Sequence, residues 1–416
     1  MADVVVIGAG LAGLRVATDL RAAGLEVVVL EARDRVGGRV WSHRFGDGQV
    51  AERGAEFIDE SHREVIALAR DLGLELSERS TEFDDGGTLV DAAGRPVPWR
   101  LHPSLASDWA RWEDVLSRME PSPDLESRSL QDAIDALGAS AVARLVIGRE
   151  VRTEFMLPPD EVSQRFAAIV HRRHPSPGRE RHRVVGGNDQ LATRLAARLG
   201  GIVQLERVVR RLDTSGEVVL GDGSVLRGDA VVATVPLPAL GRMWNEIPAG
   251  LSGVGYGIGG KISFQFARRV WRDYGRNGTV LSDRQWGHLW ETTDDQPGDR
   301  GVLTNLLASH DGAALAALPE APDRVLREVE RIFPGAAGHV VDRVHTDWTN
   351  DPYSLGCYAC FGPGQWAAAR SALERPHGRL WVAGEHTDEF TGFMEGALRS
   401  GARVARSVLE DLSRSR

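Results

Sequence analysis

Short continuous apolar runs mark the strands that this sequence predicts to be buried on both faces. Runs of this kind occur at residues 4–7 and 27–30, again at 230–235, and once more at 380–383. A strand with helices packed on both faces reads as an uninterrupted apolar run, because neither side meets water. The runs lie in three separated blocks of the chain, so one sheet built from all of them predicts a discontinuous domain.

Helical spacing of apolar residues joins the first two runs. Leu14, Ala17 and Leu20 fall on one face of a helix that Gly24 closes. The two runs and this helix together predict a complete βαβ unit near the N-terminus. Amphipathic patterns at 190–199 and 394–412 predict two further helices.

The rest of the chain is less regular. We expect helices at 109–119 and 132–151, strands with a turn at 221–223 within 203–226, and strands with one helix near 324–332 within 249–350. The polar segment 171–183 reads as a solvated loop or as a basic surface that steers acidic substrates. The predicted fold is α/β (α+β overall), with a discontinuous Rossmann-type domain made of 1–76, 183–248 and 352–416. Residues 77–182 and 249–351 are predicted to form an inserted substrate domain of mixed sheet and helices.

Composition narrows the class of protein. A chain of 416 residues with 42% hydrophobic and 26% charged residues suggests a soluble protein of two domains. Its net charge of -9 argues against nucleic acid or an anionic membrane as a partner. No apolar run approaches the roughly 18 residues of a membrane span, and structure is expected by Asp3, which leaves no room for a signal peptide. With only Cys357 and Cys360, the chain fits a reducing cytoplasm and offers no metal site.

Gly8, Gly10 and Gly13 match the pattern GxGxxG between a predicted strand and a predicted helix. Gly8 permits the tight turn, Gly10 lets the backbone approach a pyrophosphate, and Gly13 lets helix and strand pack closely. The helix N-terminus offers free N–H groups to phosphates, and Glu31 stands where an acidic residue can bind ribose hydroxyls. The motif predicts a dinucleotide site rather than a turn without ligand.

Lys261 is the single lysine among the 50 lysine and arginine residues. Chance survival of the last lysine is one explanation. The other is a site that needs a compact ammonium, which the larger and more delocalised guanidinium of arginine cannot replace.

Four segments carry a resemblance to a known family. They are Glu31-Ala32-Arg33-Asp34-Arg35-Val36-Gly37-Gly38-Arg39, Glu52-Arg53-Gly54-Ala55-Glu56, Ala383-Gly384-Glu385-His386-Thr387 and Thr391-Gly392-Phe393-Met394-Glu395-Gly396-Ala397. These segments resemble those of the flavin-containing amine oxidases, the monoamine and polyamine oxidase superfamily. The resemblance is weakest over 77–182, where substrate specificity is expected.

The resemblance implies FAD as the cofactor and names its binding residues. They are Gly8, Gly10, Gly13, Glu31, Ala32, Arg33, Gly38, Arg39, Ala55, Glu56, Val208, Trp348, Cys357, Gly384, Glu385 and Met394. In this assignment Arg39 lies beside the pyrophosphate, Glu385 meets the ribityl–phosphate region, and Val208 contacts the adenine side through its backbone. N–H groups at the Met394 end of the last helix would favour the anionic reduced flavin.

Cys357 falls where the mitochondrial members carry a thioether to the flavin, whereas many bacterial relatives bind FAD without a covalent bond. The sequence leaves both outcomes open. Cys360 completes a Cys-x-x-Cys pair, so a dithiol relay is a secondary interpretation.

The resemblance also implies that Lys261, Tyr358 and Phe393 are the catalytic residues. Lys261 matches the lysine that holds a water against flavin N5 and can stabilise charge as the reduced flavin meets oxygen. Tyr358 and Phe393 match the two aromatic positions that flank the substrate amine. The mitochondrial enzymes have tyrosine at both positions, so Phe393 changes the polarity of the slot.

The implied activity is that of an amine oxidase, in which hydride passes from the amine α-carbon to flavin N5 and leaves an imine. Its partners would be a small-molecule amine and oxygen, which yields hydrogen peroxide, and a homodimer is left open. The first alternative on the same fold is an L-amino-acid oxidase, which needs an arginine facing the carboxylate, or a desaturase of a biosynthetic intermediate. The second is a non-enzymatic FAD-binding protein, against which Lys261, Cys357, Tyr358 and Phe393 argue.

Overall fold

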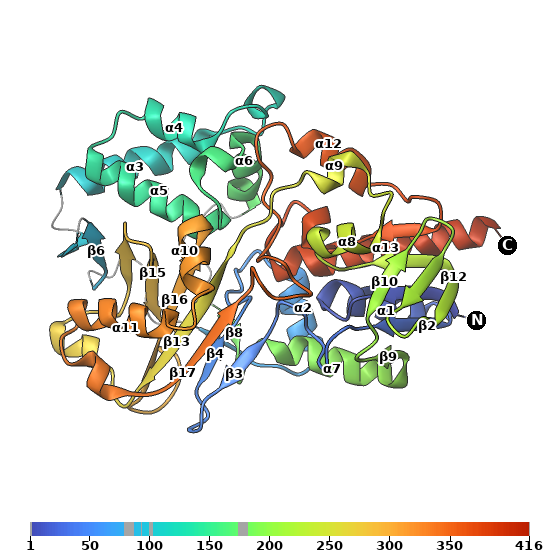
Figure 1. Ribbon diagram of the computed structural model, residues 1–416, viewed down its shortest axis with the longest axis horizontal. Helices are drawn as coiled ribbons and strands as arrows, with labels where there is room; N and C mark the ends of the chain where they lie inside the picture. The colour runs from blue at the N-terminus through green and yellow to red at the C-terminus, as the bar shows by residue number, and fades with distance from the viewer. Residues whose placement is uncertain (1, 79–86, 93, 100–102, 174–181, 416) are drawn as a thin grey trace.

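The first sheet contains the N-terminal βαβ unit. The computed structural model describes residues 2–78, 87–92, 94–99, 103–173 and 182–415. The sheet has the strand order β10–β11–β12–β1–β2–β9, with β18 paired to β12. Its strands are β1 (Ala2–Ile7), β2 (Val27–Leu30), β9 (Val203–Gln204), β10 (Val209–Leu212), β11 (Glu217–Leu220), β12 (Val225–Ala233) and β18 (Leu380–Val382). Neighbours among β9, β2, β1, β12 and β18 are parallel, and β10 and β11 form an antiparallel extension. The apolar runs predicted to share one sheet therefore do so (Figure 1).

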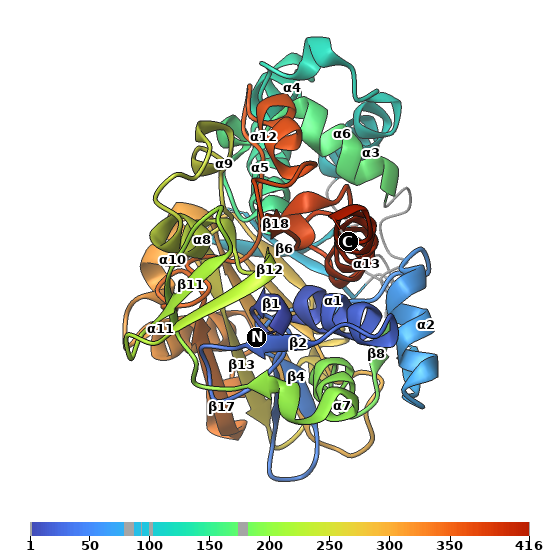
Figure 2. The same cartoon turned by 90° about the vertical axis from the view of Figure 1, so that its right-hand side faces the viewer.

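Side chains of β1 alternate between two apolar cores, which explains the uninterrupted apolar sequence of this strand. Val4 and Val6 pack in the core that includes α1 (Leu11–Ala22), α7 (Asp189–Leu199) and α13 (Met394–Ser415). Val5 and Ile7 belong to the core on the opposite face, which includes α8 (Leu237–Met243). Helices α1 and α13 lie side by side on the sheet (Figure 2). The predicted βαβ unit is confirmed.

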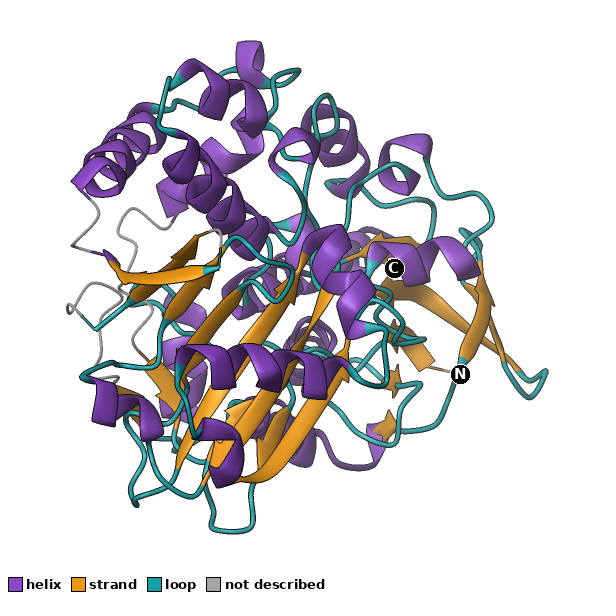
Figure 3. Cartoon of the chain, turned by 60° about the vertical axis from the view of Figure 1, so that its left-hand side comes forward, coloured by secondary structure: helices purple, strands orange, loops and turns teal. Residues whose placement is uncertain are grey.

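A second, mostly antiparallel sheet forms the other half of the molecule, in the order β17–β13–β16–β15–β14–β6–β7 with β14 parallel to β6. Its strands are β6 (Leu89–Ala92), β7 (Arg95–Pro98), β13 (Gly259–Phe266), β14 (Val280–Ser282), β15 (His288–Glu291), β16 (Gly301–Ala308) and β17 (Val340–Asp347). Helices α10 (Ser309–Ala316) and α11 (Ala321–Ile332) cover one face, where they share a core with Ile262, Phe264 and Phe266 of β13 (Figure 3). Successive strand residues point to opposite faces, so Lys261 lies on the face turned away from these helices.

Six further helices that the structure describes form a layer beside both sheets (Figure 1). They are α3 (Pro103–Arg118), α4 (Leu130–Ala136), α5 (Ala141–Phe155), α6 (Gln164–Arg173), α9 (Ala249–Ser252) and α12 (Trp366–Leu373). Helix α2 (Arg63–Asp71) packs against α13, and two small ribbons complete the fold: β3 (Ser42–Arg44) with β4 (Val50–Glu52), and β5 (Leu76–Glu78) with β8 (His182–Val184).

Some element predictions were wrong. The helix predicted over 132–151 is two helices, α4 and α5, because Gly138 takes a φ of 61° and the Ser140 side chain caps a new helix start. Helix α10 was missed, since it begins at Ser309-His310-Asp311-Gly312, a composition typical of a turn.

The predicted loop at 171–183 was also partly wrong. Helix α6 continues through Arg173, and Arg183 lies in strand β8, 5% exposed, rather than in solvent. Three carboxylates pair with its guanidinium, which explains how an arginine can be buried there. Residues 174–181 of that segment lie outside the described residues.

The α/β fold class is confirmed, and the sheet of the Rossmann-type unit draws its strands from 2–30, 203–233 and 380–382. The exact domain boundaries given above stay a prediction. Within the described part of the chain, no helix is both long and apolar enough to cross a membrane.

Candidate active site

One cavity of about 1360 Å³ runs along the boundary between the two sheets. It is lined by 18 of the 19 residues predicted for the site, with Gly13 as the exception. Those lining residues are Gly8, Gly10, Glu31, Ala32, Arg33, Gly38, Arg39, Ala55, Glu56, Val208, Lys261, Trp348, Cys357, Tyr358, Gly384, Glu385, Phe393 and Met394. The structure thus brings together residues from both ends of the chain, and the role of each residue stays a prediction.

The glycine motif forms the turn at one end of the cavity. Gly8 has a φ of 101°, a left-handed conformation that favours glycine, and a Cβ at Gly13 would overlap the carbonyl oxygen of Gly8. A Cβ at Gly10 would meet no atom of the protein, so the space beside it is open. Glu31 is buried, and its carboxylate accepts hydrogen bonds from the N–H groups of Ala9 (2.8 Å) and Arg33 (2.9 Å). The first residues of α1, Leu11 and Ala12, line the cavity together with Gly10, so the N-terminus of this helix faces the cavity, as binding of a phosphate requires.

Arg39 joins three segments at the middle of the cavity. Its Nη1 donates to the carbonyl oxygen of Cys357 (2.6 Å) and to Glu385 Oε1 (3.0 Å), and it lies 3.3 Å from the Tyr256 hydroxyl. Burial would lower the pKa of Arg39, but Tyr256 and Glu385 raise it further than burial lowers it. The guanidinium is therefore a permanent positive charge at this point.

Glu385 is more fully bonded within the protein than the sequence suggested. It is buried, and besides Arg39 it accepts hydrogen bonds from the Tyr256 hydroxyl (3.1 Å) and from the N–H groups of Ala359 (3.2 Å) and Gly392 (2.9 Å). Although burial alone would raise the pKa of Glu385, the charge of Arg39 lowers it below its ordinary value. Tyr256 belongs to this group but was missed, because nothing around it in the sequence marks it.

Cys357 and Cys360 lie in different surroundings. Cys357 lines the cavity, whereas Cys360 is fully buried in the core, and both thiols are free. Burial raises the pKa of the Cys357 thiol to about 12. The two cysteines therefore do not form a disulfide here, and only Cys357 has access to a molecule in the cavity.

Lys261 reaches the cavity from the polar face of β13. Its Nζ lies 2.8 Å from Glu56 Oε2 and donates to the carbonyl oxygen of Gly54 at 3.0 Å, with that of Glu52 at 3.5 Å. The ammonium also lies 5.3 Å from the ring centre of Trp290, within the range of a cation–π contact.

Tyr358 and Phe393 line the part of the cavity that faces the helical layer. The Tyr358 hydroxyl donates to the carbonyl oxygen of Glu154 at 2.7 Å, and the ring packs beside Gly392. The Phe393 ring lies 5.3 Å from the ring of the buried His62, and α13 begins at the next residue, Met394. Contacts with the surrounding protein therefore fix the positions of both aromatic side chains.

Arg33 and Trp348 hold loops at the cavity wall. Arg33 forms an ion pair with Asp351 at 2.5 Å and donates to Ser354 Oγ at 3.0 Å, so its guanidinium is already paired within the protein. The buried Trp348 donates its Nε1–H to the carbonyl oxygen of Arg53 at 2.8 Å.

Sequence reasoning missed two carboxylates on α5. Glu150 and Glu154 both line the cavity one helical turn apart. Desolvation together with Glu154 raises the pKa of Glu150 to about 7, and desolvation by the surrounding protein raises the pKa of Glu154, although its side chain is exposed on the cavity wall. Glu150 Oε2 has no hydrogen-bond partner among the described residues. Glu150 falls in the helix predicted over 132–151 and Glu154 lies beyond its end, and the helical pattern could not distinguish a cavity wall from a solvated face.

Three tryptophans also line this part of the cavity: Trp99, Trp109 and Trp112. Trp99 and Trp109 meet edge to face with ring centres 4.9 Å apart. The wall around the two carboxylates is therefore mainly apolar, which strengthens any charge interaction made there.

Comparison with known proteins matches the chain over most of its length. The model of the family described as flavin containing amine oxidoreductase covers residues 11–409. A protein of Mycobacterium tuberculosis, named as a candidate flavin-containing monoamine oxidase, is 29% identical over 98% of this chain and 96% of its own length. The human flavin-containing amine oxidase B is 26% identical over 99% of this chain and 87% of its own length. A solved structure of a putrescine oxidase variant with redesigned cofactor binding superposes with a TM-score of 0.86 at 25% identity, over 99% of each chain.

Proposed function

This chain belongs to the family of flavin-containing amine oxidoreductases, and from that premise we propose that it is an FAD-dependent oxidase of small-molecule amines. The products are an imine and, with oxygen as the acceptor, hydrogen peroxide. The observation that carries this proposal is the shared cavity, in which the nucleotide-binding glycines and Lys261, Tyr358 and Phe393 line one space.

The residues at the glycine end fit FAD. The open space beside Gly10, the N–H groups at the start of α1 and the charge of Arg39 suit a pyrophosphate. The cavity volume of about 1360 Å³ exceeds the roughly 300–1,000 Å³ of ordinary ligand pockets, as a site for a dinucleotide and a substrate requires. When bound, FAD supplies the acceptor for the hydride.

The chain's own residues bind and orient the amine. Tyr358 and Phe393 offer ring faces on which an amine and its carbon chain are held in one direction. Lys261 offers an ammonium on the cavity wall, where it can stabilise the negative charge that develops as oxygen is reduced. The tryptophan wall excludes water, which protects the imine until it leaves.

Glu150 and Glu154 support a substrate class: amines that carry a second cationic group. A half-buried carboxylate without a partner is costly, and a substrate ammonium would supply the missing partner. The Tyr358 hydroxyl donates to the backbone carbonyl oxygen of Glu154, and Glu150 lies one helical turn from Glu154 on α5. Both carboxylates are therefore near the aromatic residues. A diamine can place one nitrogen between the rings and the other beside α5.

The residues that line the cavity argue against the alternative function of an L-amino-acid oxidase. Within the described part of 77–182 and 249–351, the residues that line the cavity include carboxylates and no arginine. A substrate carboxylate would therefore meet negative charge where it needs a guanidinium.

Attachment of FAD through Cys357 is the finer part of the cofactor proposal, supported by the place of this cysteine on the cavity wall.

A peroxide assay on purified FAD-loaded protein tests the proposal with matched substrates. We expect turnover of 1,4-diaminobutane above that of n-butylamine, and little turnover of L-amino acids. In Glu154→Gln the KM for the diamine should rise about tenfold while that for the monoamine changes little, because one charge-assisted hydrogen bond is lost. Protein that binds FAD but oxidises no member of an amine panel contradicts the proposed function.

A further inference from the structure

We propose that Glu56 is a positioning residue whose carboxylate fixes the direction of the Lys261 ammonium, and that Arg183 fixes Glu56 in turn. This inference rests on the proposed function, because Lys261 is the residue assigned there to the reduction of oxygen. The three side chains are 6% exposed for Arg183, 1% for Glu56 and 11% for Lys261.

The ammonium of Lys261 has three N–H donors, and the protein engages two of them closely. One meets Glu56 Oε2 at 2.8 Å and another the carbonyl oxygen of Gly54 at 3.0 Å. The third makes only a long contact of 3.5 Å with the carbonyl oxygen of Glu52, so it is the donor that a partner in the cavity lined by Lys261 can engage. The two close bonds therefore set the direction of the third donor.

Glu56 is itself held at its other oxygen. Oε1 accepts hydrogen bonds from Thr292 Oγ1 at 2.5 Å and Trp290 Nε1 at 3.0 Å, and it pairs with Arg183 Nη1 at 3.2 Å. Burial alone would raise the pKa of Glu56, but Lys261 and Arg183 lower it to about 2. The carboxylate is thus an anion between two cations, with one oxygen for each.

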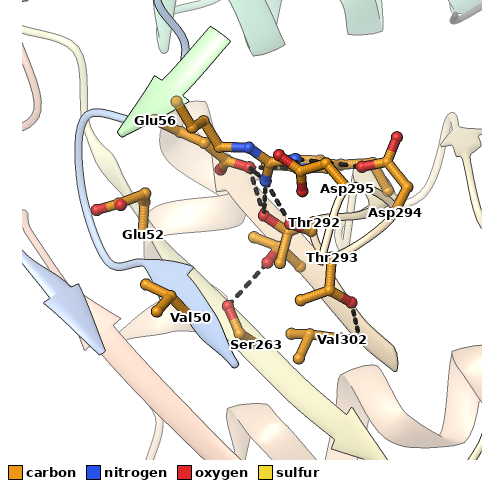
Figure 4. Close-up of polar contacts among 12 residues, drawn as sticks. Val50, Glu52, Glu56, Ser263, Thr292, Thr293, Asp294, Asp295 and Val302 are labelled. Carbon is orange, nitrogen blue, oxygen red and sulfur yellow. Dashed lines mark hydrogen bonds and ion pairs between the residues drawn. The ribbon is translucent and has the colours of Figure 1, made fainter. Parts of the chain in front are cut away.

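Arg183 connects this pair to a further acidic segment. Its Nη2 lies 3.2 Å from Asp294 Oδ1 and 3.1 Å from Asp295 Oδ1, and its Nη1 donates to the backbone and hydroxyl of Thr292. Figure 4 shows Glu56 beside Thr292, with Asp294 and Asp295 farther along the same segment as Thr292. The network therefore joins strand β8, the Glu52–Glu56 segment, β13 and the chain after β15.

The charges explain why Glu56 is required. Lysine is a flexible side chain with an ammonium at its end, and burial of that ammonium is costly unless it is paired. Without the carboxylate, two buried cations would face the same space, and their repulsion would turn Lys261 toward water or another acceptor. Glu52 is the natural control, because it is also a buried carboxylate but bonds through its side chain to Ser42 and Asn188.

The single lysine allows a direct test. Incorporation of 15N-labelled lysine into the FAD-loaded protein yields one side-chain ammonium signal by NMR, and its hydrogen exchange with water reports how firmly the group is held. We expect exchange in Glu56→Gln to be at least about tenfold faster than in native protein, and Glu52→Gln to stay within about twofold. If Glu56→Gln does not fold, Glu56→Asp keeps the charge one methylene farther away and should show an intermediate rate.

A second measurement links the geometry to oxygen without any amine. The flavin is reduced photochemically and mixed with oxygen, and reoxidation in Glu56→Gln should be about tenfold slower than in native protein or Glu52→Gln, as misplacement of a positioned group predicts. Equal ammonium exchange in Glu56→Gln and native protein overturns the proposal. A native enzyme that oxidises no amine contradicts the proposed function instead, and the exchange comparison still decides whether Glu56 holds Lys261.

Discussion

Replacement of Lys261 tests whether this residue acts in only one of the two half-reactions. In Lys261→Met the cavity loses its ammonium while Tyr358 and Phe393 remain. We expect reoxidation of the reduced flavin by oxygen to slow about a hundredfold, as loss of one positioned donor typically does, and anaerobic reduction by the amine to change much less. Stopped-flow absorbance measures both. Arg21→Met, on the exposed side of α1, is the control, and equal losses in both half-reactions would indicate a structural role for the lysine.

Glu150 should leave a signature in the pH dependence of stability. Its pKa is raised to about 7 in the folded protein from an ordinary value of 4.5, so its ionised form is disfavoured by folding. The free energy of unfolding should therefore fall as the pH rises from about 4.5 through 7. A variant without an ionisable side chain at position 150 should lack this contribution to the fall.

Urea unfolding at pH 5.5 and pH 8 measures this effect. Glu150→Gln should be more stable than the native protein at pH 8, by about 1 kcal/mol because the side chain is only half-buried, and close to it at pH 5.5. Glu410→Gln, exposed on α13, should show no such difference. If the native protein is as stable as Glu150→Gln at pH 8, or more stable, the environment described for Glu150 is contradicted.

Replacement of Cys357 tests whether the flavin is retained through a covalent bond. The sulfur lies on the cavity wall, and a thioether at this position would keep flavin with the protein after acid precipitation. We expect flavin in the pellet of the native protein and in the supernatant of Cys357→Ser, with Cys360→Ser as the matched control because that thiol is buried in the core. Flavin released from the native protein would leave Cys357 as a small neutral residue beside a non-covalent ring.

Residue identities in the site were predictable where a motif or a rarity marked them. The glycine motif and the single lysine both line or frame the cavity. Arg183 was not predictable as a buried residue, because its three acidic partners come from segments more than a hundred positions away. Glu150 and Glu154 were not predictable either, because a helix pattern does not tell which polar face meets a cavity.

At the scale of elements, the turn between β1 and α1 allows its two glycines to be tested separately. A Cβ at Gly13 overlaps Gly8 O, so Gly13→Ala should destabilise the protein itself by about 2–4 kcal/mol, with or without FAD. A Cβ at Gly10 meets only open space, so Gly10→Ala should fold normally and lose affinity for FAD. Thermal unfolding with and without added FAD measures both. Equal behaviour of the two variants would contradict this division of roles.

Strands of the first sheet were predictable because both faces of β1 are apolar, with Val4 and Val6 in one core and Val5 and Ile7 in the other. Helix α10 was not, because its first turn contains Asp311 and Gly312, and its helical state depends on packing against β13 and β16. Tertiary contacts decide such segments, and local patterns do not contain them.

At the scale of the whole molecule, the sequence predicted an interrupted sheet but not how the second sheet is ordered. The order β17–β13–β16–β15–β14–β6–β7 pairs β6 with β14 across most of the substrate region. Pairings of this range depend on loop closure and packing, which no stretch of alternating residues specifies. The cavity depends on this order, since Lys261 of β13, Leu306 of β16 and Trp290 of β15 line it from adjacent strands.

The packing of α1 against α13 has a consequence for biosynthesis. On the ribosome, β1, α1 and β2 emerge well before α13, the helix that packs against α1 and contributes Met394 to the cavity wall. Until then the part of α1 that packs against α13 is uncovered, and exposed apolar surface of this kind favours aggregation of a partly folded chain. We therefore expect a chain that stops before α13 to bind no flavin, because its cavity lacks the wall to which Met394 belongs.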